Sequence, residues 1–165
     1  MVQLESTLKI LRLIWMAFVG SIATFLVVLF VVDAASDVEP LIPLMLAFVA
    51  FTEVPILFVM RKQMLGTLAL REPEDLRAEG RVDGDALEGA LKGAAMRYQT
   101  GSIVSFALVE SIAIMGFVAS FMTGSWVWFG GHAGVALVLY FVLRPTRGGA
   151  LSILTPQERE GVRQL

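Results

Sequence analysis

Long stretches almost without charged residues are the feature that most constrains this chain. Residues 13–32 contain no charged side chain, and residues 41–60 contain only Glu53. Residues 98–143 hold one acid, Glu110, and one histidine, His132. A helix needs about 20 mostly apolar residues to cross the hydrocarbon core of a bilayer. The chain is therefore predicted to be an integral membrane protein.

The longest of these stretches is predicted to fold back on itself. As one helix, residues 98–143 would extend about 70 Å, more than twice the thickness of the hydrocarbon core. Gly124 and Ser125 interrupt the apolar run and indicate a turn. The prediction is one all-α domain, residues 1–165, that forms a bundle of four transmembrane helices at residues 13–32, 41–60, 100–121 and 126–143.

The basic residues indicate the orientation of the helices. All 13 Lys and Arg residues lie before residue 13, within residues 61–97 or after residue 143. The two loops on the other side contain none of them. Under the positive-inside rule, both termini, the segment 61–99 and the tail 144–165 are therefore predicted to be cytoplasmic, with the protein in the inner (plasma) membrane.

The segment between the second and third spans is predicted to be partly helical. Asp85 and Glu88 are typical of a helix start. No proline follows until after the third span, so one helix is expected from about residue 86 to residue 121. Its first third would extend the bundle into the cytoplasm.

Glu53 and Glu110 are the only acids inside predicted spans, and no Lys or Arg lies in any span. Burial without a cationic partner favours the protonated carboxyl. Counted from the cytoplasmic ends, Glu53 lies about 12 Å and Glu110 about 16 Å deep. At such similar depths, two nearby carboxyls would titrate as a coupled pair. Reversible proton or ion binding and permanent protonation in a structural hydrogen bond both fit these acids.

Residues 107–118, ALVESIAIMGFV, resemble the carboxylate-bearing second helix of subunit c, the rotor-ring proteolipid of rotary ATP synthases. The resemblance implies that Glu110 binds a proton or sodium ion. It also implies that Ser111 supplies a hydroxyl, as in some sodium-binding members of that family. The chain departs from the family at Met115, where a tyrosine is common, and in residues 41–60, which lack the family's glycines.

The stretch Arg71-Glu72-Pro73-Glu74 resembles the Arg-Gln-Pro-Glu of the cytoplasmic loop in the same family, which contacts the central stalk. The resemblance implies that Arg71, Pro73 and Glu74 dock a cytoplasmic protein partner. The mixed charges around them equally fit a solvated connector.

Small residues are spaced for close helix packing. Gly130 and Gly134 form a GxxxG pattern, and Gly116 with Ser120 has the same spacing. Such positions let helices approach closely, either within one bundle or between the copies of a homo-oligomer.

His132 lies about 10 Å from the outer surface by residue count. A single histidine without a second nitrogen or sulfur ligand nearby is a poor metal site, so neither a metal nor a cofactor is predicted. Histidine is the residue type whose unperturbed pKa is nearest to neutral pH. The expected role of His132 is either a proton relay between Glu110 and the outside or a hydrogen bond between helices.

The composition and the absence of known motifs argue against nucleic-acid binding and against catalysis. A net charge of −2, from 13 basic and 15 acidic residues, provides no basic surface for nucleic acid. The chain has no cysteine, phosphate-binding loop, HExxH motif or Ser-His-Asp arrangement, so it is not predicted to be an enzyme. We expect a protein of the lipid bilayer that binds or conducts protons at Glu110, assisted by Glu53. The alternative is a structural or adaptor subunit whose segment 61–99 docks a partner and whose acids are passively protonated.

Overall fold

The computed structural model describes residues 2–32, 41–66 and 84–154, and this part of the chain is helical, without strands. The predicted all-α class is confirmed for these residues. In chain order the helices are α1 (Val2–Val31), α2 (Leu41–Gly66), α3 (Gly84–Thr123), α4 (Trp126–Val142) and α5 (Arg147–Leu151).

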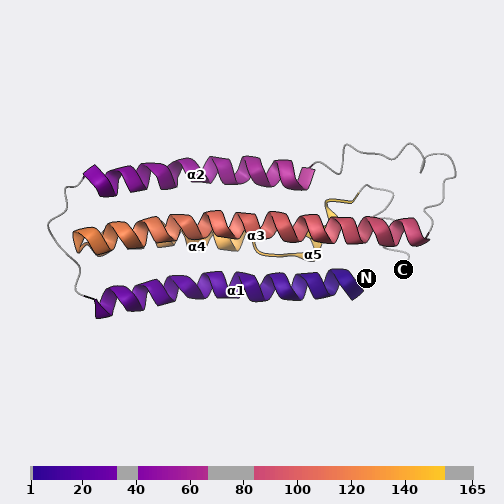
Figure 1. Ribbon diagram of the computed structural model, residues 1–165, viewed down its shortest axis with the longest axis horizontal. Coiled ribbons are helices and arrows are strands. Elements are labelled where there is room, and N and C mark those ends of the chain that lie inside the picture. The colour runs from indigo at the N-terminus through magenta and orange to yellow at the C-terminus, as the bar shows by residue number, and fades with distance from the viewer. Residues whose placement is uncertain (1, 33–40, 67–83, 155–165) are drawn as a thin grey trace.

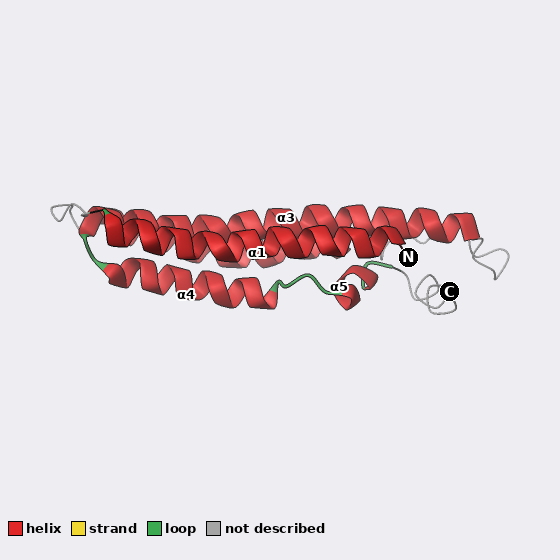
Figure 2. Ribbon diagram, turned by 90° about the horizontal axis from the view of Figure 1, so that it is seen from below, coloured by secondary structure: helices red, strands yellow, loops and turns green. Residues whose placement is uncertain are grey.

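Helix α3 is the centre of the bundle. It has 40 residues, which corresponds to about 60 Å. Helices α1 and α2 lie along opposite sides of α3 (Figure 1), and the view turned by 90° shows α4 below the layer that α1 and α3 form (Figure 2). Each of the other helices packs against α3. The side chains of α3 therefore meet a different neighbour on each side.

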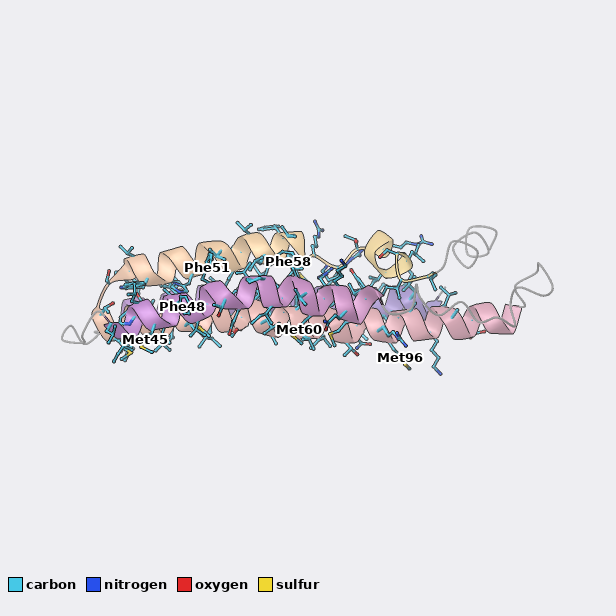
Figure 3. All side chains as sticks on the ribbon, turned by 90° about the horizontal axis from the view of Figure 1, so that it is seen from above. Met45, Phe48, Phe51, Phe58, Met60 and Met96 are labelled. Atoms are coloured by element: carbon cyan, nitrogen blue, oxygen red, sulfur yellow. The ribbon has the colours of Figure 1, made fainter. Side chains whose placement is uncertain are left out.

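Three helices are long and apolar enough to cross a membrane: Leu4–Val31, Leu41–Gly66 and Glu88–Thr123. Helix α4 is apolar but shorter, with 17 residues. Large apolar side chains point away from the bundle, and five of them along α2 are labelled in Figure 3: Met45, Phe48, Phe51, Phe58 and Met60. Such a long apolar surface is unfavourable in water and suited to lipid. The length and apolar surface of these helices suit a membrane protein.

Helix α1 begins well before the predicted span 13–32. Its first three turns are helical because Leu4, Leu8 and Leu11, spaced three or four residues apart, are buried on one side. They belong to the same core cluster as Leu91 and Tyr98 of α3. Tertiary packing therefore extends the helix beyond the apolar run.

The turn predicted near residues 122–125 is confirmed. Helix α3 ends at Thr123, α4 begins at Trp126, and Gly124 between them has a φ of 64°. This left-handed conformation favours glycine, which has no Cβ. The single helix predicted from about residue 86 to residue 121 is observed as α3, Gly84–Thr123.

Helix α4 ends at Val142 because Pro145 cannot donate a backbone hydrogen bond to the carbonyl of Phe141. Instead, the Arg144 N–H reaches that carbonyl at 3.4 Å. The carbonyl of Tyr140 accepts a hydrogen bond from the indole Nε1–H of Trp15 at 2.9 Å, which joins α1 to the end of α4.

Candidate functional site

The carboxyl of Glu110 is hydrogen-bonded to Tyr140. Glu110 is partly buried on α3, and Tyr140 is fully buried on α4. The hairpin of α3 and α4 brings the Tyr140 Oη to 2.7 Å from Glu110 Oε2. The same Oη lies 3.3 Å from the backbone carbonyl oxygen of Phe106, one turn before Glu110 on α3. The phenol therefore lies between a carboxyl and a carbonyl.

This arrangement satisfies both protonation states of Glu110. A tyrosine hydroxyl has one proton to donate, and its oxygen can also accept a hydrogen bond. When Glu110 is ionised, Tyr140 donates to the carboxylate. When Glu110 is protonated, the carboxyl can donate to the Tyr140 oxygen while the phenol proton turns to the carbonyl of Phe106. When Glu110 gains or loses a proton, rotation of this one hydroxyl is enough to adapt the hydrogen bonds.

Glu53 has an equivalent arrangement on the other side of α3. The Ser111 hydroxyl is hydrogen-bonded to Glu53 Oε2 and lies 2.7 Å from the carbonyl oxygen of Leu108. A hydroxyl again lies between a carboxyl and a backbone carbonyl of α3. Because Glu53 comes from α2, this second site is at the α2–α3 contact, whereas the Glu110 site is at the α3–α4 contact.

The two acids lie at the same level, but they are not hydrogen-bonded to each other. Glu53 binds Ser111, the residue next to Glu110, which sets the two carboxyls at similar depths. Successive residues of an α-helix are rotated by about 100°. Glu110 and Ser111 therefore turn toward different helices, so each carboxyl has its own hydroxyl partner.

His132 is not part of either carboxyl site. Its Nδ1 lies 2.7 Å from the carbonyl oxygen of Trp128. Since a carbonyl can only accept, Nδ1 carries the proton in the neutral ring. His132 is also two turns of α4, about 12 Å, from Tyr140. The structure therefore does not bring it to Glu110, as a direct relay would require.

The small residues have different surroundings. A Cβ built on Gly116 would lie 2.7 Å from His132 Cγ, so this glycine permits the close approach of α3 and α4. A Cβ on Gly130 or Gly134 would meet nothing within 4 Å. These two glycines therefore do not pack helices together within the described bundle. The Ser120 hydroxyl donates to the carbonyl of Ser125 at 2.7 Å and so helps to close the turn.

Tyr140 was not predicted from the sequence as a partner of Glu110. It is one of two tyrosines in the chain and the only one in the last apolar run, which was the available signal. The predicted docking residues Arg71, Pro73 and Glu74 lie outside the described residues.

Within residues 2–32, 41–66 and 84–154, His, Asp and Glu side chains do not gather in groups of three that could hold a metal ion. Comparisons with models of known protein families, with curated proteins and with solved structures found no match to this chain.

Proposed function

We propose that the protein binds protons reversibly at Glu110 within the inner membrane. The position of the Tyr140 hydroxyl, between Glu110 and the carbonyl of Phe106, is the observation that supports this function. An acid that gains and loses a proton in a low-dielectric interior needs hydrogen-bond partners in both states, because an unsatisfied buried polar group costs about 1–3 kcal/mol. The carboxyl–hydroxyl–carbonyl arrangement provides them.

Glu53 is a second proton-binding residue at the same level of the bundle. The Ser111 hydroxyl lies between the Glu53 carboxyl and the carbonyl of Leu108, as the Tyr140 hydroxyl lies between Glu110 and the carbonyl of Phe106. The resemblance of residues 107–118 to the carboxylate helix of subunit c also supports proton binding at Glu110. In that resemblance Ser111 accompanies the ion-binding acid, whereas here its hydroxyl is bonded to Glu53.

The proposed topology has α4 as a fourth span and both termini in the cytoplasm. At 17 residues, α4 is about 25 Å long and covers most of a hydrocarbon core of about 30 Å. It follows α3 after a turn of two residues and runs back along it (Figure 2). The one-sided distribution of the 13 basic residues supports the orientation.

The test is carbodiimide labelling of the protein in liposomes, with the labelled residue identified by mass spectrometry across pH 5–9. Carbodiimides react with protonated carboxyls, so labelling of Glu110 should fall as the pH rises. Glu110→Gln should abolish that label and leave the label on Glu53, and Glu53→Gln should do the reverse. Tyr140→Phe should increase labelling of Glu110 at neutral pH, because the ionised carboxylate has lost its donor. Labelling that does not change with pH, or an absence of labelling, would refute reversible binding.

The second candidate is a structural or adaptor subunit. The burial of Leu4, Leu8 and Leu11 in the same core cluster as Leu91 of α3 favours it, because packed helices then extend beyond the apolar runs, where a partner can bind. In this case Glu110→Gln leaves assembly normal, and deletion of residues 67–84 releases a protein that co-purifies with the wild type. A wild-type preparation from which nothing co-elutes would count against the adaptor.

A further inference from the structure

A groove lies beside the first half of α4. It is about 350 Å³ in volume and lies between α2 and α4, with Ile112 of α3 at its floor. Helices α2 and α4 make little contact with each other, which leaves the space open. Its walls are apolar apart from the imidazole of His132 and the indole N–H of Trp128, and they include Ala50, Phe51, Val54 and Gly131.

His132 provides one hydrogen-bond acceptor for this groove. Nδ1 carries the proton because it faces the carbonyl of Trp128 at 2.7 Å. The Cγ and Nδ1 side of the ring also faces Gly116, which leaves Nε2 at the other end of the ring. No hydrogen bond to Nε2 is present among the described residues. An acceptor without a partner in apolar surroundings favours a ligand that donates to it.

We propose that the groove binds a neutral lipophilic molecule with one hydroxyl, a phenol or a long-chain alcohol, which donates its proton to His132 Nε2. The apolar body of the ligand would lie against Phe51 and Val54. The volume falls within the range of about 300–1,000 Å³ that is usual for small-molecule sites. No charged side chain lines the groove, so a charged ligand has no counter-ion there. This site is separate from proton binding at Glu110.

His132 is the only histidine of the chain, so it can be observed directly. The protein is labelled with ¹⁵N-histidine and studied by NMR in detergent micelles, where it gives one pair of imidazole nitrogen signals. The spectra are recorded at a pH well above the unperturbed pKa of histidine, about 6.5. The probe is para-nonylphenol, and its control is the methyl ether para-nonylanisole, which has the same apolar body and no donor. The phenol should shift the Nε2 signal saturably and bind about tenfold tighter than the ether. Equal binding of both, or a shift that never saturates, overturns the proposal.

Two glycine variants distinguish ligand binding in the groove from binding elsewhere on α4. A Cβ on Gly131 or Gly130 meets nothing within 4 Å, so both sites accept a side chain without a backbone clash. Gly131 lines the groove and Gly130 does not. Gly131→Leu should abolish the phenol-induced shift, and Gly130→Leu should keep it. A shift that survives Gly131→Leu overturns the proposal.

Light scattering, which measures the mass of the protein in solution, tests whether a second copy of the chain fills the groove instead. If a second copy of the chain fills it, the wild type is an oligomer and Gly131→Leu lowers its mass, which also refutes ligand binding. Glu110→Gln should leave the phenol-induced shift unchanged. The outcome for the groove can therefore be distinguished from the outcome for the proton site.

Discussion

Substitution of Gly116 by alanine tests the contact between α3 and α4. The new Cβ would lie 2.7 Å from His132 Cγ, whereas carbon atoms in favourable contact are about 3.5–4.0 Å apart. The Cβ of His132 lies closer still to the new Cβ, and because a Cβ moves with its backbone, the two helices would have to separate by about 1 Å or more at this point. Overpacking of this kind costs about 1–3 kcal/mol.

Gly130→Ala is the matched control. Both substitutions gain the same helix propensity, about 1 kcal/mol, but the Cβ on Gly130 meets nothing within 4 Å. The propensity gain therefore cancels in the comparison, and the difference in unfolding free energy between the two variants should equal the overpacking cost of about 1–3 kcal/mol.

Thermal unfolding in detergent, followed by circular dichroism, measures this difference. For chains of this size 1 kcal/mol corresponds to a shift of about 2–4 °C in the melting temperature. Gly116→Ala should therefore melt at least about 2 °C below Gly130→Ala. Equal melting temperatures, or a higher one for Gly116→Ala, would show that α3 and α4 do not approach closely at Gly116.

Three further predictions use the same measurement. Leu8→Ala should lower the free energy of unfolding by about 2–5 kcal/mol, because Leu8 is 1% exposed. Leu13→Ala, at a residue that is 63% exposed, should change it by less than about 0.5 kcal/mol. Equal losses for the two variants would contradict the packing of α1. Ser102→Ala should stabilise the protein by about 1 kcal/mol, since its buried Oγ has no hydrogen-bond partner among the described residues, and Ser105→Ala, which removes a hydrogen bond to Gly101, should not. Trp15→Phe should cost about 1 kcal/mol by removing the hydrogen bond to the Tyr140 carbonyl, and an unchanged melting temperature would refute that bond.

The sequence predicted the helices better than their ends. Apolar runs identified α2, α3 and α4 because burial in a bilayer demands long uncharged segments. The true start of α1 was missed because residues 2–12 are charged as well as apolar, and they are helical only through the packing of Leu4, Leu8 and Leu11. The turn at Gly124 was predictable because its signal is local.

The candidate site was predicted only in part. Glu53 and Glu110 are conspicuous in the long apolar runs, because an acid in a membrane-spanning helix costs free energy and is therefore rare. Their partners could not be predicted, since hydrogen bonds to Ser111 and Tyr140 depend on how each helix is rotated about its own axis.

The sequence by itself determined that the chain forms helices long and apolar enough for a membrane, that α3 and α4 form a hairpin, and which two acids lie within the long apolar runs. Tertiary structure alone decided that these acids turn to different neighbours, that Gly116 receives His132, and that Gly130 faces open space. In a soluble helix the apolar side marks the core, but lipid is as apolar as the bundle interior, so the pattern of apolar residues does not show which side of a helix faces inward.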